Sequence, residues 1–151
     1  MANVNVLDVA QYIINNSGRL TTWKLQKLCY YSQAWSLVWD DEPLFKQRIE
    51  SWANGPVIPN LYEKHRGSFY VNNVRGEPEK LNKTQRETVD AVLKVYGKKS
   101  SSQLSAISHR ESPWKDARRR AHLDIGERGN SQIRLGDMAE YYEGLNAQGT
   151  T

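Results

Sequence analysis

Residues 23–39 read WKLQKLCYYSQAWSLVW, a long run with neither glycine nor proline, and Thr21 or Thr22 can cap its first turn. At 100° per residue, the apolar side chains of a helix here fall on two opposite stripes. One stripe holds Leu25, Leu28, Cys29, Trp35 and Trp39, and the other holds Trp23, Tyr30, Ala34, Leu37 and Val38. Such a helix is either the central layer of a domain or a core helix whose second face receives a partner. We expect the central layer.

Amphipathic helices are predicted on both sides of this segment. Before it, apolar residues at helical spacing follow Asn5, which can act as an N-cap, and Gly18 ends the helix. After it, residues 45–52 indicate a short irregular strand that Asn54-Gly55-Pro56 closes. A helix follows from Pro59 to Gly67, and residues 68–80 fit a strand or an ordered loop.

The C-terminal half is expected to be helical. Asn82 begins a capping box for a helix that ends at Gly97, and Ser101 or Ser102 starts a short helix through Ile107. Ser112 is the expected N-cap of the next helix, with Pro113 at its first position. After a loop over residues 124–131, Ile133 and Leu135 either add a short strand or lead directly into a last helix that includes Met138 and Leu145. Residues 146–151 should fray.

Length and composition fit one domain over residues 1–151. Mean hydropathy is -0.74, and no run approaches the ~20 apolar residues that a membrane-spanning helix needs. Five Trp, eight Tyr and two Phe can close a small core. We predict a mainly α, compact single-domain helical bundle with a central two-faced helix and a short accessory β-hairpin or small sheet.

The charge pattern gives little support for nucleic-acid binding. The net charge of +4 is spread over both halves, and the dense basic cluster is Arg118-Arg119-Arg120. That cluster could meet phosphate or an acidic partner, or form a solvated face. Cys29 cannot form an internal disulfide, and the N-terminus lacks the pattern of a signal peptide. Both observations favour a cytoplasmic protein.

The residues that could carry catalysis or bind metal are scattered. Cys29, His65, His109 and His122 lie far apart in sequence, unlike the ligands of a zinc site. Cys29 sits on an apolar stripe, where a thiol stays protonated. Ser108, His109 and Glu111 are too close in sequence to surround one substrate atom. We expect His109 instead to contact the terminal carbonyls of its own helix, and we predict no enzyme, cofactor or metal.

Three blocks of sequence carry a resemblance to a known family. They are KLQKLCYYSQAW (24–35) with PLF (43–45), IESWANGPVIPNLY (49–62), and LSAISH (104–109) with SPWKDAR (112–118). Together they resemble the SocA-type antitoxin domain, also called the Panacea domain, which includes phage-associated GepA-like proteins. The resemblance covers about residues 5–145.

The resemblance implies a non-catalytic, mostly helical antitoxin that neutralises, by direct binding, a toxin encoded by an adjacent gene. Toxins of this family include alarmone-synthetase-like enzymes that modify tRNA and small membrane-active peptides. The ClpXP protease is a further possible partner, as are homo-oligomers or hetero-oligomers with the toxin. The alternatives are a phage- or prophage-encoded interaction protein, a proteolytic adaptor, and a nucleic-acid-binding regulator.

The family blocks separate expected structural residues from expected partner-binding residues. The structural set is Leu28, Tyr30, Trp35, Trp52, Gly55, Pro56, Tyr62, Pro113 and Trp114. The helix over residues 23–39 presents its lysines on one seam, and a toxin that handles nucleotides often has an acidic or metal-binding site to cover. We therefore expect a partner-binding set on the surface, made up of Lys24, Lys27, Tyr31, His109 and Arg118. Changing Lys24, Lys27 and Arg118 together to Glu should therefore abolish toxin neutralisation without unfolding the protein.

Overall fold

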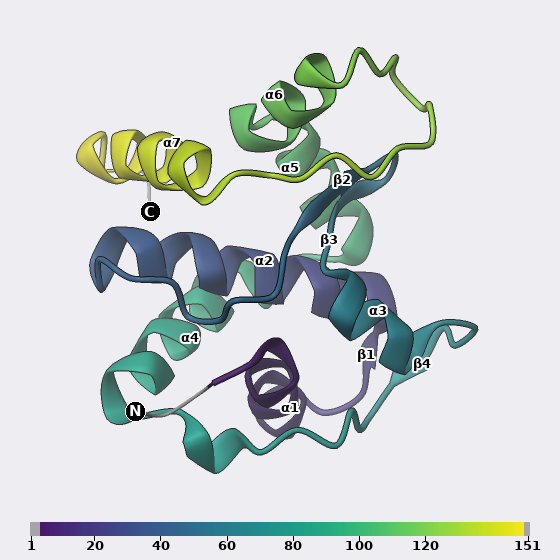
Figure 1. The fold of residues 1–151 in the computed structure, drawn as a ribbon. Coiled ribbons are helices and arrows are strands. Elements are labelled where there is room, and N and C mark those ends of the chain that lie inside the picture. The colour runs from purple at the N-terminus through teal and green to yellow at the C-terminus, as the bar shows by residue number, and fades with distance from the viewer. Residues whose placement is uncertain (1–3, 150–151) are drawn as a thin grey trace.

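The computed structural model describes residues 4–149 and is mainly α-helical, as predicted (Figure 1). The elements are α1 (Val6–Ser17), β1 (Leu20–Thr21), α2 (Thr22–Trp39), β2 (Glu50–Trp52), β3 (Gly55–Val57), α3 (Pro59–His65), β4 (Tyr70–Val71), the 3₁₀ helix η1 (Pro78–Lys80), α4 (Lys83–Tyr96), α5 (Ser101–Arg110), α6 (Ser112–Arg120) and α7 (Leu135–Ala147).

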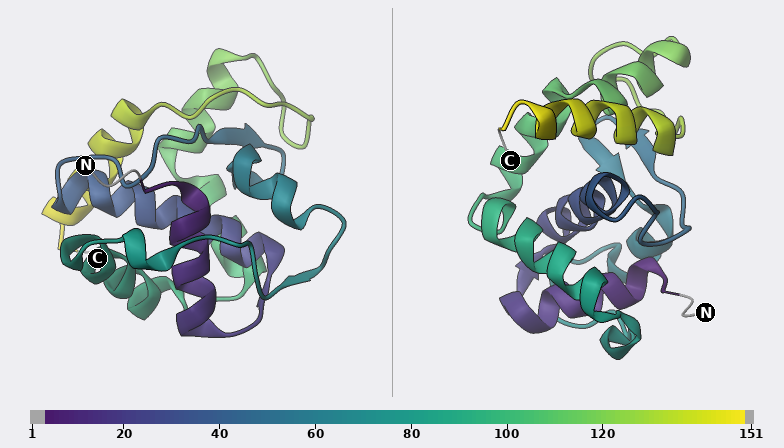
Figure 2. Two further views of the ribbon diagram at one scale, coloured as in Figure 1. Left: turned by 60° about the horizontal axis from the view of Figure 1, so that its bottom comes forward. Right: turned by 90° about the vertical axis from the view of Figure 1, so that its left-hand side faces the viewer.

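The helix α2 forms the central layer of the fold. It packs against α1, α4, α5 and α7, and Figure 2 shows it between α1 and α4 on one side and α7 on the other. Every residue from Leu25 to Ser36 is buried. The prediction of a central two-faced helix is confirmed, and the protein's own elements cover both apolar stripes except at the C-terminal end of α2, where Trp39 is 40% exposed.

The side chains of two glutamines of α2 form hydrogen bonds with the backbone of neighbouring loops. The Gln26 side chain accepts from the amide of Ile58 at 2.8 Å and donates to its carbonyl at 3.3 Å. The Gln33 side chain accepts from the amide of Leu44 at 2.7 Å and donates to the carbonyl of Phe45 at 2.8 Å. Because buried amide groups need partners, these contacts fix the loops that lead into and out of the β2–β3 hairpin.

Local capping signals set most helix ends. Asn5 and Asn82 form capping boxes with Asp8 and Gln85, and Gly18 ends α1 with a φ of 76°. The N-cap of α6 is Glu111, not Ser112 as predicted, and its side chain makes no capping bond. This carboxylate is bound elsewhere, in the core.

Two small antiparallel sheets accompany the helices. In one, β1 pairs with β4, so the stretch 68–80 contains a strand. In the other, β2 and β3 form a hairpin in which Trp52 pairs with Gly55. The strand predicted over residues 45–52 is shorter than expected, because only residues 50–52 pair with β3.

The predicted fraying begins too early. Asn146 and Ala147 complete the last turn of α7. Of the remaining residues in that prediction, 150–151 lie outside the described part of the chain. Among the described helices, none is both long enough and apolar enough to span a bilayer.

A buried polar cluster joins α2, the start of α6 and α7. The hydroxyl groups of Tyr31 and Tyr142 each donate to the Glu111 carboxylate at 2.7 Å. Tyr31 also stacks on Tyr96, with ring centroids 4.1 Å apart. Burial raises the pKa of Glu111, while the two tyrosine hydrogen bonds oppose that rise. The cluster holds α7 against α2. The candidate functional site lies at the other, N-terminal end of α2.

Candidate functional site

Three hollows meet at the turn of the β2–β3 hairpin, residues Ala53 and Asn54. We call the residues that line them the hairpin-turn surface. The first hollow, about 430 Å³, is lined by Trp23, Trp52, Ala53, Asn54, Val57, Arg128, Gly129 and Asn130. The second, about 460 Å³, is lined by Ala53, His109, Trp114, Lys115, Arg118, Arg119, Leu123, Ile125 and Gly126. The third, about 190 Å³, is lined by Trp23, Lys27, Asn54, Ser101, Ser102 and Ser105.

The hairpin-turn surface combines aromatic rings with positive charge. Its cations are Lys27, Lys115, Arg118, Arg119 and Arg128, and none of the three hollows has an Asp or Glu among its lining residues. Tryptophan and arginine are the residue types most enriched at the energetic centres of protein interfaces. The hairpin-turn surface therefore has residue types that are typical of a protein contact surface.

The second hollow has one fully exposed apolar side chain at its edge. Ile125 is 99% exposed and lies in the loop between α6 and α7. The buried guanidinium of Arg118 holds that loop, because it donates to the carbonyls of Asp124 at 2.8 Å and Glu127 at 2.5 Å. It also donates to the carbonyl of Ser51 in β2 at 2.9 Å, which ties the loop to the hairpin.

The expectation that Arg118 lies on the surface is wrong. The residue is 3% exposed, and its guanidinium lies 5.1 Å from the ring of Trp114. Arginine can be buried in this way because its planar group satisfies several carbonyls at once. Arg118 thus supports the hairpin-turn surface from the protein interior, by holding the loop and β2 together.

Lys27 and Tyr31 are also buried, contrary to their expected surface position. They are 1% and 0% exposed, because neighbouring elements surround α2 over residues 25–36. The Tyr31 hydroxyl is bound to Glu111. A triple change of Lys24, Lys27 and Arg118 to Glu would place two carboxylates in the interior, so it tests folding rather than binding.

Lys24 and His109 are the two members of the partner-binding set that remain partly exposed. The Lys24 amine donates to the carbonyl of Gly97 at 2.6 Å. The His109 ring is 3.1 Å from the carbonyl of Ala53, so it contacts the hairpin rather than the end of its own helix as expected. Burial lowers the pKa of His109, and the contact with Ala53 opposes that effect.

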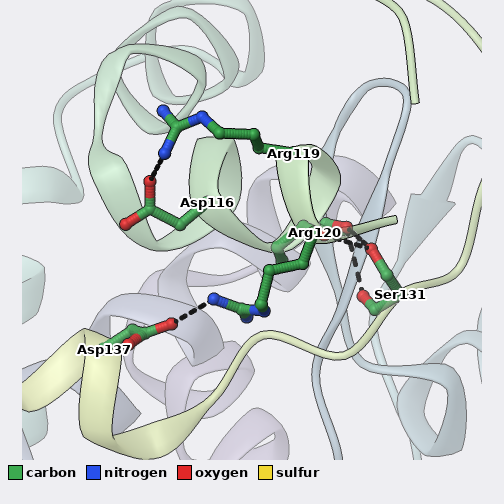
Figure 3. Close-up of polar contacts among 7 residues, drawn as sticks. Asp116, Arg119, Arg120, Ser131 and Asp137 are labelled. Atoms are coloured by element: carbon green, nitrogen blue, oxygen red, sulfur yellow. Dashed lines mark hydrogen bonds and ion pairs between the residues drawn. The ribbon is translucent and has the colours of Figure 1, made fainter. Parts of the chain in front are cut away.

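The other two arginines of the 118–120 cluster form ion pairs, as Figure 3 shows. Arg119 pairs with Asp116 on the same helix at 2.8 Å. Arg120 pairs with Asp137 of α7, also at 2.8 Å, and so links α6 to α7. The three arginines therefore do not form one basic patch, because Arg118 is buried, Arg119 pairs within α6 and Arg120 pairs with α7.

The structure brings several residues of the predicted structural set to the hairpin. The Trp114 indole donates to the carbonyl of Trp52 at 2.8 Å, and the rings of Trp52 and Tyr62 lie 5.0 Å apart. Gly55 has a φ of 124°, a backbone conformation that favours glycine. The remaining members, all buried, are Leu28, Tyr30, Trp35, Pro56 and Pro113.

The described residues show no arrangement suited to metal binding. Within residues 4–149, no group of three or more His, Cys, Asp or Glu side chains could hold a metal ion. Cys29 is fully buried among apolar residues, and this burial raises the pKa of its thiol.

Comparison with known proteins decides the family. The family described as "Antitoxin SocA-like, Panacea domain" matches residues 25–115. These residues contain most of α2, the whole β2–β3 hairpin and α5. The chain belongs to the SocA-like Panacea family of antitoxins. It is similar to Antitoxin SocA of Caulobacter vibrioides, with 28% identity over 130 residues, covering 74% of this chain and 69% of that protein. No solved structure gives a significant match.

Sequence reasoning missed much of this Panacea protein's surface, including Trp23, Asn54, Ile125 and Arg128. Trp23 was assigned only to an apolar stripe, and Asn54 only to a turn. Ile125 lies in a segment dominated by glycine and charge, and this isolated apolar residue was the one signal available there. Arg128 joins the surface because hydrogen bonds of Arg118 and Ser51 hold its loop against β2.

Proposed function

We propose that this protein neutralises a cognate toxin by binding it directly through the hairpin-turn surface, without catalysis. The observation that carries the proposal is membership of an antitoxin family. The surface supports it, since three adjoining hollows present Trp23, Trp52 and Ile125 beside cations with no acidic lining residue. Aromatic anchors of this kind supply affinity, and the charges favour an acidic partner.

The charge of this surface favours one class of toxin. Enzymes that handle nucleotides often carry acidic or metal-binding sites, and a basic antitoxin surface can cover such a site. An alarmone-synthetase-like toxin acting on tRNA fits this description, and its active site would be occluded by the bound antitoxin. We expect the toxin to be encoded by the adjacent gene and to act in the same compartment, the cytoplasm.

Co-expression tests the proposed function. The product of the adjacent gene should arrest growth when expressed alone, and co-expression of this protein should restore growth. The two proteins should also copurify as a complex. Persistent arrest despite folded antitoxin would contradict the proposal. Repeating the co-expression in cells that lack ClpXP separates occlusion from proteolytic delivery, because occlusion requires no protease.

A DNA-binding regulator would behave differently. Its affinity for promoter DNA would fall steeply with salt, in proportion to the number of phosphates that it neutralises. The proposed protein interface requires no such binding. An electrophoretic mobility assay with the protein's own promoter therefore distinguishes the two functions.

A further inference from the structure

We infer that the third hollow of the hairpin-turn surface is a carboxylate-binding pocket, in which Lys27 receives an acidic side chain of the docked protein partner. The carboxylate chemistry of the pocket stands on the structure alone. The identity of its occupant, an Asp or Glu of the toxin, rests on the proposed function.

The first support is an unpartnered cation at the pocket. Lys27 is 1% exposed and lines the hollow, and its amine makes no hydrogen bond or ion pair with residues 4–149. The amine lies over the ring of Trp23, with the ring centroid 5.6 Å away. Since no fully enclosed side-chain nitrogen among residues 4–149 lacks a hydrogen-bond partner, the unbonded Lys27 amine must reach the hollow, where it can meet an anion that arrives from outside.

The second support is the amino end of α5, which opens into the same pocket. Ser100 and Gln103 form a capping box, so the Gln103 amide is satisfied. The amides of Ser101 and Ser102 occupy the first two helical positions, which have no acceptor within a helix. The partial positive charge at this helix end adds to that of Lys27.

Further hydrogen-bond donors line the pocket, and no acidic group does. The Ser102 hydroxyl and the Asn54 carboxamide have no partner among residues 4–149, and both residues are exposed. Two other hydroxyls are already engaged, since Ser105 donates to the Asn54 carbonyl at 2.7 Å and Ser101 is bonded to Thr21.

The size of the pocket selects its occupant. Its volume of about 190 Å³ lies below the range of roughly 300–1,000 Å³ typical of small-molecule sites. It can take the end of one side chain but not a nucleotide. It also shares Trp23 and Asn54 with the first hollow, so a protein that covers the hairpin turn can insert an acidic side chain here.

The pKa of Lys27 agrees with this role. Burial lowers it to about 8, so the amine is still mostly protonated at pH 7. A carboxylate beside the amine would favour its charged form. Binding would thus supply the counter-charge that the described residues do not.

The direct test uses propionate, which has the carboxylate and carbons of a Glu side chain. At constant ionic strength set with chloride, propionate should shift the NMR amide signals of Asn54, Ser101 and Ser102 saturably. The response should disappear in Lys27→Met and persist in Lys94→Met, a control at an exposed lysine on α4. No saturable shift in the wild type, or an unchanged response in Lys27→Met, would overturn the inference.

A second variant covers the case in which Lys27→Met fails to fold. Ser102→Glu supplies a carboxylate from an exposed position at the pocket. It should abolish the propionate response and raise the melting temperature. A retained response would overturn the inference equally.

The occupant is tested by affinity for the adjacent gene's product. Lys27→Met should weaken that binding at least tenfold, and Lys94→Met should leave it unchanged. Equal affinities, together with a positive propionate result, would overturn the assignment to a partner's side chain and leave a site for small carboxylates. If the wild type does not bind the product at all, the proposed function and the assignment of the occupant are both contradicted. The propionate titration still tests whether the pocket binds a carboxylate.

Discussion

The Cε atom of Lys27 lies 2.7 Å from the point that a β-carbon on Gly55 would occupy. Any side chain at residue 55 would therefore collide with Lys27. A residue other than glycine would also be strained by the backbone φ of 124° at this position. The glycine of the family block and the buried lysine of α2 form one structural unit.

Gly55→Ala should lower the free energy of unfolding by about 1–3 kcal/mol, because it introduces both backbone strain and the collision. Chemical denaturation measures the loss. Gly136→Ala is the matched control: Gly136 has open space around it on α7, so this change should be neutral or stabilising. In the Lys27→Ala background, Gly55→Ala should cost at least about 0.5 kcal/mol less. Strict additivity would contradict the coupling of the two residues.

Lys27→Met should raise stability at pH 7 by roughly 1–3 kcal/mol, because it removes a buried charge. The folded-state pKa of Lys27 is about 8, below its ordinary 10.5, so the unfolded chain binds more protons between these values. Wild-type stability from this group therefore rises with pH through that window. The advantage of Lys27→Met should shrink between pH 8 and 10.5, as urea titrations can measure. A pH-independent difference would refute this account.

Glu111→Gln should be at least as stable as the wild type at neutral pH. The amide oxygen can accept from Tyr31 and Tyr142, since both hydroxyls bind the same carboxylate oxygen. Burial raises the pKa of Glu111 above its usual 4.5, so the folded state binds more protons there and wild-type stability falls as pH rises from 4.5 through that raised pKa. Glu111→Gln should lose this pH dependence.

The control for Glu111→Gln is a variant without any hydrogen-bond acceptor at residue 111. Glu111→Leu deprives the two tyrosine hydroxyls of the carboxylate and should cost about 2–4 kcal/mol. Thermal unfolding from pH 4 to 8 compares the variants. Equal stabilities of Glu111→Leu and Glu111→Gln would show that the hydrogen bonds contribute nothing.

Arg118→Met should destabilise the protein by about 2–4 kcal/mol, because three backbone carbonyls lose their donor. Hydrogen exchange should accelerate in residues 124–130, which the guanidinium holds. The neighbouring Arg119 is the control: its side chain is 73% exposed and, among residues 4–149, pairs only with Asp116 on its own helix. Arg119→Met should change stability by less than about 0.5 kcal/mol. Similar losses in both variants would contradict the assigned role of Arg118.

The helices could be predicted from sequence because their signals are local. Asn5, Gly18 and Asn82 set helix ends through caps, and the two apolar stripes of α2 indicated a central helix. The burial of Lys27 and Arg118 could not be predicted in this way. Sequence patterns place charged residues outside, whereas these two are enclosed by segments that are distant in sequence.

The candidate site was beyond prediction for the same reason. The family blocks pointed to Trp52, Gly55 and Trp114, which surround the hairpin. The first two hollows are formed in part by the loop over residues 124–130, which lies against β2 through the hydrogen bonds of Arg118 on α6. Long-range packing of this kind leaves no local periodicity, so Ile125 and Arg128 gave no signal of a shared surface.

The claim that the hairpin-turn surface binds the toxin is tested most directly by calorimetric titration with the adjacent gene's product. Ile125→Glu changes a side chain that is 99% exposed, so it should leave the melting temperature unchanged. Trp39→Glu is the control: Trp39 is 40% exposed and lies about 24 Å along α2 from Trp23. We expect Ile125→Glu to weaken binding at least tenfold and Trp39→Glu to retain wild-type affinity. Wild-type affinity in Ile125→Glu, or loss of binding only in Trp39→Glu, would contradict the claim.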